Sequence, residues 1–201
     1  MSQNYKQLLH YTTCDVADAL QALGHDGYLP ELQLYSPANN AGCIVGLAHT
    51  VKHVSVNDMG APKPSEHFVD SAQPGSIIVM STPEGSINAV WGGLMSTRAK
   101  YLGVQGVVID GRCRDLDEHR AMAFPASVPI DICRTTHSAT VRIHPGDIIM
   151  ADGNGVVRVR PEWLAEIIDL CEQQTKVDER CLDDLRAGHS IQATFAKHRG
   201  Q

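Results

Sequence analysis

Several short apolar runs, each bounded by glycine or a Pro-Gly pair, limit most strongly what this chain can fold into. They include "PGSIIVM" (74–80), "VQGVVIDG" (104–111) and "PGDIIMADGNGVVRV" (145–159). Runs of this length suit short buried strands and fall far below the roughly 20 residues that span a bilayer. The last run predicts two strands joined by a turn within Asp152–Gly155. Further strands are expected at 41–56, 128–134 and 139–144.

Helical segments separate these strands. The stretch "TTCDVADALQALG" (12–24) predicts a helix with Thr13 as its N-cap and Gly24 as its stop. A second helix is expected over Leu94–Leu102, ended by Gly103. Helical character is also present at 115–123, in a short helix near Ser65, and in a long extension from about residue 161.

The order of these elements points to a fold class. Strands alternate with helices in the middle of the chain, and hairpin-like strands come late. This favours an α/β fold with a mixed sheet or two sheets over a purely parallel doubly wound sheet. The chain has 201 residues and no linker or low-complexity segment, so residues 1–201 are expected to form one domain.

Composition argues against two classes of partner and indicates a cellular compartment. A formal net charge of −6, without any run of Lys or Arg, argues against a nucleic-acid footprint. The first residues lack the apolar core of a secretory signal, and no membrane partner is expected. Six scattered cysteines without a CxxC pair are expected to be reduced thiols in a cytoplasmic protein.

The stretch "VVIDGRCRDLDEH" (107–119) gathers charged and imidazole side chains after a buried strand, where α/β proteins usually place ligands. Asp115, Glu118 and His119 share one face if a helix begins near residue 115. Such carboxylates suit a hard cation such as Mg²⁺, and Arg114 could fork onto a substrate carboxylate. The same spacing also fits a capped surface helix with charge pairs.

A second candidate lies just upstream in "NAVWGGLMSTRAK" (88–100). Gly92 and Gly93 come directly before an expected helix start, where free N–H groups and the helix dipole can receive a carboxylate or phosphate. A purely structural turn explains two glycines at a helix start equally well.

The stretch "WGGLMSTRAKYLGVQGVVIDGRCRD" (91–115) resembles the RraA-like family, which contains regulators of RNase E activity and metal-dependent 4-hydroxy-4-methyl-2-oxoglutarate aldolases. The family's signature is a helix-start residue, twenty positions and then Arg-Asp. Here Gly93 is followed by twenty residues and Arg114-Asp115, with Glu118 after two more. The resemblance extends to "DVADAL", "PGSIIVM" and "PGDIIMADGNGVVRV", over roughly residues 13 to 170.

This resemblance implies a layered α/β/β/α sandwich with mixed sheets, of the swivelling-domain type, in a homotrimer or hexamer with active sites between subunits. Asp115 would ligate Mg²⁺, Mn²⁺ or another divalent cation, partly through waters. Arg114 would bind the pyruvyl oxygens, and the N–H groups around Leu94 and Met95 would receive the pyruvate carboxylate.

Two departures from the family pattern bear on the chemistry. Many of the aldolases carry Asp where this chain has Gly93. We hypothesise that Glu118 supplies the missing carboxylate from the other side of the metal. Arg112 stands where small residues are common, and it adds a cation that could read a dicarboxylate substrate.

The expected function is therefore a metal-dependent lyase on small 2-oxo acids, with Arg114, Asp115 and Glu118 as catalytic residues. The metal acts as a Lewis acid and Arg114 stabilises the pyruvate enolate. Retro-aldol cleavage of a 4-hydroxy-2-oxo acid and decarboxylation of oxaloacetate both yield that enolate, and only the first needs a base for the C4 hydroxyl. A non-catalytic regulator that binds a protein partner is the alternative. A more specialised carboxylated substrate, read by Arg112 and the loop at 57–66, also stays open.

The remaining polar residues are expected to be ordinary. Trp91 is expected to pack rather than bind, and Cys113 has no visible partner base for nucleophilic catalysis. Five histidines lack ligand spacing, although His67 lies in a loop that could reach the site. These are His49, His53, His67, His137 and His144.

Overall fold

A computed structural model describes residues 4–36, 42–129 and 141–200, without the side chains of 127–129. Its main feature is an eight-stranded sheet in the order β1-β10-β9-β3-β4-β6-β8-β2, which confirms the predicted mixed sheet. Its strands are β1 (Tyr28–Leu29), β2 (Leu32–Ser36), β3 (Ile44–Lys52), β4 (Ile77–Ser81), β6 (Gly106–Asp110), β8 (Ala126–Pro129), β9 (Ile148–Asp152) and β10 (Gly155–Val159). Two shorter strands, β5 (Ala89–Trp91) and β7 (Arg112–Cys113), pair separately and in parallel.

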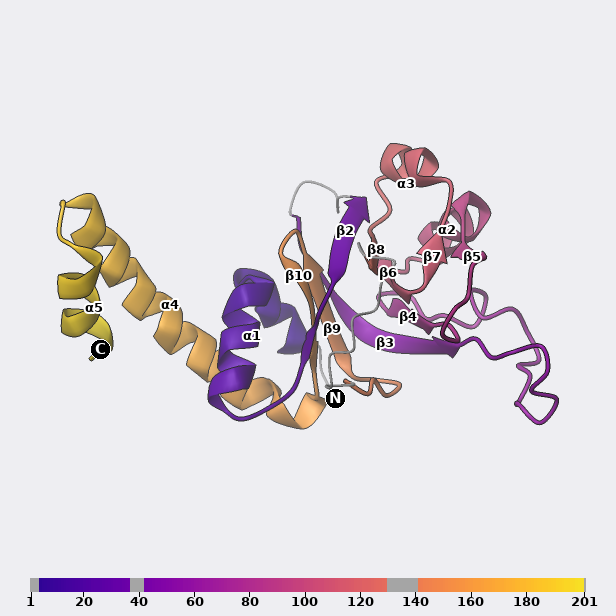
Figure 1. The fold of residues 1–201 in the computed structure, drawn as a ribbon, viewed down its shortest axis with the longest axis horizontal. Coiled ribbons are helices and arrows are strands. Elements are labelled where there is room, and N and C mark those ends of the chain that lie inside the picture. The colour runs from indigo at the N-terminus through magenta and orange to yellow at the C-terminus, as the bar shows by residue number, and fades with distance from the viewer. Residues whose placement is uncertain (1–3, 37–41, 130–140, 201) are drawn as a thin grey trace.

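The long strand β3 joins two halves of different character. On one side it pairs antiparallel with β9, which forms the predicted hairpin with β10. On the other side it pairs in parallel with β4, and β4, β6 and β8 continue in parallel. The sheet curls so that β2 comes close to β10 (Figure 1). One continuous sheet therefore supplies both inner layers of the fold.

Alternation along the strands divides the buried side chains among three cores. Ile77, Val108 and Ile149 point between the two halves of the sheet. Their neighbours Ile78 and Val107 point outward beneath α2, in a second core. On the other half, Ile148, Met150 and Val157 point outward against α1 and α4. Because side chains alternate across a strand, these three cores give the α/β/β/α layers.

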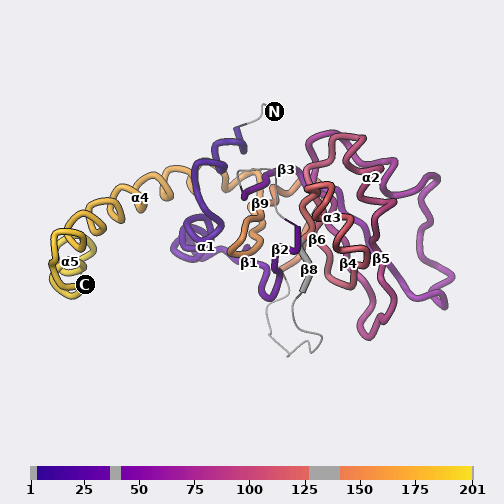
Figure 2. The backbone as a smooth tube through the Cα atoms, turned by 90° about the horizontal axis from the view of Figure 1, so that it is seen from above, coloured from indigo at the N-terminus to yellow at the C-terminus, as the bar shows by residue number. Residues whose placement is uncertain are grey.

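The helices lie outside this curled sheet. They are a 3-10 turn at Asn4–His10, α1 (Thr13–Ala22), α2 (Gly93–Tyr101), α3 (Leu116–Met122), a 3-10 turn at Pro161–Trp163, α4 (Leu164–Arg186) and α5 (Ile191–Arg199). Figures 1 and 2 show α4 leading away from the sheet, with α5 folded back along its far end. The helices α2 and α3 stand together at the opposite end, beside β5 and β7 (Figure 1). Within the described residues, none of these helices is long and apolar enough to cross a membrane.

The start of α1 differs from the prediction by one residue. Thr12, not Thr13, is the N-cap, because Asp15 three residues later completes a capping box with it. Thr13 instead bonds through its N–H and its hydroxyl to the buried carboxylate of Asp152, at 2.9 and 2.6 Å. Thr13 therefore does not cap the helix but joins the start of α1 to Asp152, at the end of β9.

The prediction of a short helix near Ser65 is wrong. The chain forms turns there, with i to i+3 bonds from Asp70 N to His67 O and from Ala72 N to Val69 O. The ring of His67 accepts the N–H of Val69 at 3.3 Å, which removes a donor that a helix would use.

The two strands predicted at 128–134 and 139–144 lie partly outside the described residues. Of the strand expected at 128–134 the structure describes the first residues, in β8, and the remainder with Cys133 lies outside the described residues. His137 also lies outside them, and residues 141–144 are not in a strand. The five described cysteines are free thiols.

Candidate functional site

The start of α2 carries the first part of the site. Gly92 is the N-cap and has no side chain to accept an N–H from the first turn. The Oδ2 atom of Asp115 takes that place, accepting the N–H of Gly93 at 3.0 Å. The N–H groups of Leu94 and Met95 have no hydrogen-bond partner among the described residues. Two donors at the positive end of the helix dipole are thus open to an anion.

Asp115 reaches α2 because of an unusual backbone. It directly precedes α3 with φ 62° and ψ 39°, a left-handed conformation that costs a residue other than glycine about 1 kcal/mol. Its side chain does not cap its own helix, α3, but turns toward the neighbouring one. Strain of this kind concentrates at functional sites.

Arg114 lies beside this carboxylate. Its Nε is 3.6 Å from Asp115 Oδ2, and its side chain is 74% exposed against 36% for Asp115. The two terminal guanidinium nitrogens make no hydrogen bond with any described residue. Gly92 leaves room for both side chains, because a Cβ there would lie 2.6 Å from Asp115 Oδ2 and 3.2 Å from Arg114 Nε.

Glu118 approaches the same helix start from α3. A Cβ on Gly93 would overlap the carboxylate of Glu118, so the acid on α3 occupies the volume that a side chain at position 93 would need. The two positions are thus alternatives for one space. This is the placement that the hypothesis of a replaced acid requires.

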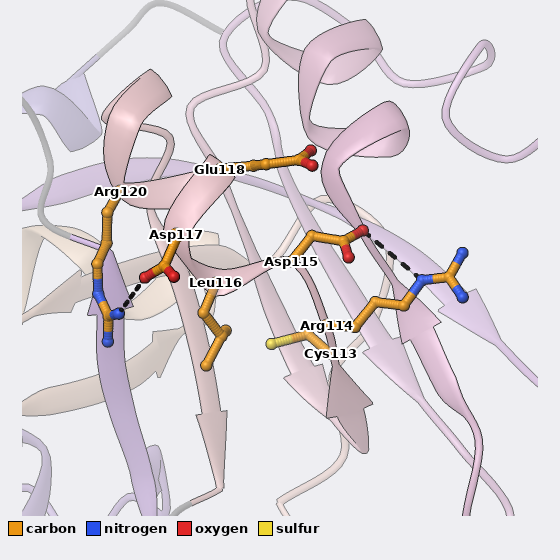
Figure 3. A pocket seen from close by; sticks show the side chains of 7 residues that line it. All are labelled: Cys113, Arg114, Asp115, Leu116, Asp117, Glu118 and Arg120. Carbon is orange, nitrogen blue, oxygen red and sulfur yellow. Dashed lines mark hydrogen bonds and ion pairs between the residues drawn. The ribbon is translucent and has the colours of Figure 1, made fainter.

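These residues border an open hollow of about 640 Å³. Figure 3 shows the carboxylates of Asp115 and Glu118 projecting to one side, toward α2, with Arg114 beside Asp115. Asp117 and Arg120 lie on the other side and pair with each other at 3.0 Å. The pairing of Asp117 with Arg120 is what a surface helix shows, whereas Asp115 and Glu118 face the neighbouring helix start.

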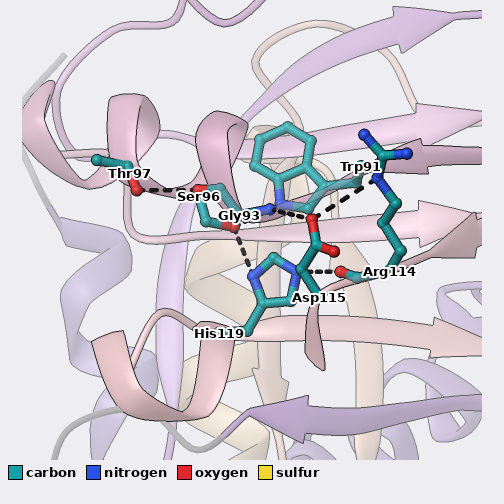
Figure 4. A network of polar contacts seen from close by, with 7 residues as sticks. All are labelled: Trp91, Gly93, Ser96, Thr97, Arg114, Asp115 and His119. Atoms are coloured by element: carbon teal, nitrogen blue, oxygen red, sulfur yellow. Dashed lines mark hydrogen bonds and ion pairs between the residues drawn. The ribbon is translucent and has the colours of Figure 1, made fainter. Parts of the chain in front are cut away.

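Behind this exposed cluster lies a buried chain of hydrogen bonds that the sequence analysis did not identify (Figure 4). Trp91 Nε1 donates to Ser96 Oγ at 2.7 Å, and Ser96 Oγ is 2.7 Å from His119 Nδ1. His119 Nε2 lies 2.8 Å from the carbonyl oxygen of Arg114. We call Trp91, Ser96 and His119 the buried trio, since each is at most 1% exposed.

The structure does not bring every predicted residue to the hollow. Its lining residues all lie within 113–120, so Gly92, Gly93, Leu94 and Met95 lie beside the hollow and do not line it. Arg112 donates from Nη1 to the carbonyl of Ile87 at 3.3 Å and does not line the hollow. His67 stacks on Phe68, with 4.4 Å between ring centroids, and also lies outside it. Trp91 packs in the core, stacked on Phe124 as expected for a structural residue.

Cys113 lines the hollow but is poorly suited to attack. Burial, with the nearby charge of Asp115, raises the pKa of its thiol. The thiolate is the nucleophilic form, so a raised pKa works against covalent catalysis.

The donor set around Asp115 fits a hard divalent cation that keeps most of its waters. No cluster of three or more His, Cys, Asp or Glu side chains suited to a metal occurs among the described residues. Asp115 Oδ1 has no hydrogen-bond partner among them, whereas Oδ2 contacts Gly93 and Arg114. Mg²⁺ is commonly held by one or two carboxylates plus water and substrate oxygens, and Asp115 would supply one such carboxylate.

Comparison with known proteins places this geometry in context. The family model for RraA-like proteins, described as Aldolase/RraA, matches residues 13–158. An uncharacterized protein of Methanocaldococcus jannaschii is 38% identical over 73% of this chain and 78% of its own length. A protein of Halalkalibacterium halodurans, named as a 4-hydroxy-4-methyl-2-oxoglutarate aldolase, is 28% identical over 84% of this chain and 81% of its own. The crystal structure of an uncharacterized protein from Pseudomonas syringae is 25% identical, with a TM-score of 0.82, over 98% of this chain and 95% of that one.

Proposed function

This chain belongs to the RraA-like family, and from that premise we propose that it is a divalent-metal-dependent carbon–carbon lyase acting on small 2-oxo acids. A similar protein named as an aldolase supports a lyase in general terms. The observation that carries the proposal is the left-handed turn that aims Asp115, with Arg114 beside it, at the open helix start of α2.

Substrate binding follows from the two open donors of α2. The carboxylate of a 2-oxo acid accepts the N–H groups of Leu94 and Met95, at the positive end of the helix. Arg114, with its terminal nitrogens unpaired among the described residues, donates to the keto oxygen. The substrate's pyruvyl part is thereby fixed between α2 and the turn before α3.

Asp115 is the residue that would hold Mg²⁺ or Mn²⁺, through Oδ1. When bound, the cation supplies Lewis-acid polarisation of the substrate's carboxylate and keto oxygens. Arg114 stabilises the negative charge that reaches the keto oxygen when the C3–C4 bond breaks, because a guanidinium beside a developing oxyanion offsets its charge. A proton then returns to C3 to give pyruvate.

Glu118 is proposed to remove the proton from the C4 hydroxyl in the retro-aldol reaction, directly or through a water. It is the carboxylate next to Gly93, where many of the resembling aldolases carry their acid. Decarboxylation of oxaloacetate releases CO₂ and needs no such base. The two reactions therefore depend on Glu118 to different degrees.

A second copy of the chain is proposed to cover the open side of the hollow, in a homotrimer or hexamer. Large apolar side chains are exposed on α2, in the loop after β3 and in the loop before β5: Val56, Met59, Ile87, Leu94 and Tyr101, each at least 74% exposed. Large exposed apolar side chains support an interaction surface in this part of the chain. Replacing both Ile87 and Tyr101 by Glu should yield smaller particles in light scattering, and unchanged mass would contradict this assembly.

A non-catalytic regulator is the alternative, because the family description covers RraA proteins as well as aldolases. A binding surface alone does not require a strained Asp turned onto a helix start beside an unpaired arginine. A dicarboxylate preference read by Arg112 is less favoured, since its guanidinium contacts the Ile87 carbonyl outside the hollow.

The test is pyruvate release from oxaloacetate and from a 4-hydroxy-2-oxo diacid, measured by a coupled assay with Mg²⁺ and with EDTA. We expect both substrates to yield pyruvate with Mg²⁺ and neither to do so with EDTA. Turnover that is indifferent to EDTA would refute the metal-dependent reaction. Protein that releases no pyruvate from either substrate would leave the regulator as the better reading.

A further inference from the structure

We propose that His119 is a positioning residue that holds the Arg114–Asp115 turn in register with α2 through one hydrogen bond. The bond runs from His119 Nε2 to the carbonyl oxygen of Arg114, over 2.8 Å. The bond is drawn in Figure 4, and the ring of His119 that makes it is fully buried. The proposal rests on the proposed function for its activity and Mn²⁺ readouts, whereas hydrogen exchange at the Gly93 amide is independent of it.

Hydrogen-bond capacity determines which way this chain of contacts runs. The carbonyl of Arg114 can only accept, so His119 Nε2 carries the hydrogen. The indole of Trp91 can only donate, so Ser96 Oγ accepts from it and has its own hydrogen to give to His119 Nδ1. Donation therefore runs in one direction from Trp91 through Ser96 and His119 to Arg114.

This chain connects three elements of the site. Trp91 ends β5, Ser96 lies in the first turns of α2, and His119 lies in α3. The backbone of Arg114 is held at both ends, since its N–H donates to the carbonyl of Trp91 at 3.0 Å. With both groups held, the peptide that leads into the left-handed Asp115 has little freedom to rotate.

Burial makes the restraint effective. His119 and Ser96 have no exposed surface, and the carbonyl of His119 accepts a further bond from Ser36 Oγ at 2.9 Å. A ring enclosed in this way cannot exchange its partners for water. His119 thus sets the distance between the carboxylate of Asp115 and the donors of α2 without touching substrate.

Two substitutions separate positioning from packing. The amide nitrogen of Gln reaches about as far as His Nε2, whereas that of Asn reaches only as far as Nδ1. His119→Gln therefore keeps the bond to Arg114 and gives up Ser96, and His119→Asn does the reverse. Both lose the ring, so both should lower the melting temperature by similar amounts.

The readouts are kcat, KM, Mn²⁺ affinity by electron paramagnetic resonance, and hydrogen exchange at the Gly93 amide. In His119→Asn we expect kcat to fall by on the order of 10- to 100-fold with KM little changed, because a reacting group displaced by about 1 Å loses that much. Mn²⁺ binding should weaken and the Gly93 amide should exchange at least about tenfold faster, as its bond to Asp115 loosens. For His119→Gln, we expect kcat, KM, Mn²⁺ affinity and the exchange rate of the Gly93 amide each to stay within about threefold of the parent.

Equal behaviour of the two variants in Gly93 exchange and Mn²⁺ affinity would overturn the positioning role, even if both variants were less stable. If the parent protein releases no pyruvate, the proposed function fails alone. Gly93 exchange then still decides whether His119 holds Asp115 in place.

Discussion

The exposed cluster of Arg114, Asp115 and Glu118 and the buried trio of Trp91, Ser96 and His119 lie on opposite sides of the same turn, yet differ in almost every physical respect. In the cluster the charges face an open hollow, and several donors and acceptors have no partner among the described residues. In the trio every side-chain donor and acceptor is used and water is excluded. The cluster is suited to chemistry and the trio to geometry, so substitutions should separate activity from stability.

The largest separation is expected at Asp115. Asp115→Ala should lower kcat/KM for pyruvate release by at least about 100-fold, since it removes the carboxylate proposed to hold the cation. The melting temperature should fall only slightly: water can replace the lost bond to Gly93, although Ala tolerates the left-handed backbone less well than Asp. The coupled pyruvate assay and thermal denaturation measure the two effects.

Asp115→Asn is the matched control for that variant. It keeps an oxygen for the Gly93 N–H and tolerates the left-handed backbone, but it lacks the charge. Stability equal to the parent with activity as low as Asp115→Ala is the expected outcome. Near-parental activity in either variant would show that the cluster has no catalytic carboxylate at this position.

At Ser96 we expect the opposite result, a larger loss of stability than of activity. Ser96→Ala leaves the buried N–H of Trp91 and Nδ1 of His119 without a partner, which should cost about 2 kcal/mol of unfolding free energy. For a chain of this size that lowers the melting temperature by roughly 4–8 °C. The activity per folded molecule should fall less than the stability does, because the bond from His119 to Arg114 remains.

Thr97→Ala provides the comparison, since it removes an exposed hydroxyl from the next position of the same helix. That hydroxyl bonds to the Gly93 carbonyl at 2.9 Å and can be replaced by water. We expect a cost within about 0.5 kcal/mol. Equal destabilisation by the two substitutions would contradict the distinction between the trio and the surface.

Moving the carboxylate from position 118 to position 93 tests the proposed role of Glu118 as a base. Glu118→Gln should lower retro-aldol cleavage by roughly tenfold, below the usual range for a general base because water can substitute, and change oxaloacetate decarboxylation much less. Gly93→Asp alone should also lower activity, because the end of the Glu118 side chain must rotate away from the new carboxylate. The double variant Gly93→Asp with Glu118→Ala should recover retro-aldol activity above Glu118→Gln. Failure of the double variant to exceed either single one would count against a shared carboxylate position.

The smallest effect is expected at Cys113, which lines the hollow without a proposed role. Its pKa is raised by burial and by Asp115, so the neutral thiol prevails at neutral pH and reacts slowly. Cys113→Ser should leave kcat/KM within about twofold of the parent, which corresponds to less than 0.5 kcal/mol. A larger loss would extend the cluster beyond its three charged residues.

The contrast between the two regions also explains what the sequence revealed. The helix predicted over Leu94–Leu102, found at 93–101, and the buried strand before Asp110 follow from local patterns. The spacing of Asp115 and Glu118 put them on one face but fitted a capped surface helix as well. The resemblance to the RraA-like family, rather than local order alone, selected Arg114, Asp115 and Glu118 as candidates.

The buried trio could not be found in the same way. Trp91, Ser96 and His119 come from three elements, and only the folded chain makes them neighbours. His119 was predicted to share a face with Asp115 and Glu118, but it is buried whereas those two side chains are exposed. Ser96, as a small polar residue in a helix, carried no signal. The same limit applies to the role of Thr13, which bonds to Asp152, remote in sequence, whereas the N-cap at Thr12 follows from the local capping box with Asp15.

The overlap between position 93 and the acid of α3 restricts how such a site can change over evolutionary time. A mutation that installs an acid on α2 meets an occupied space, whereas loss of Glu118 first leaves the site without either group. A chain that exchanges one arrangement for the other therefore needs the exposed side chain of Glu118 to rotate away, to shorten or to be lost. The residue at the start of α2 and the acid on α3 thus limit each other, and a change at one position alters which side chains the other can carry.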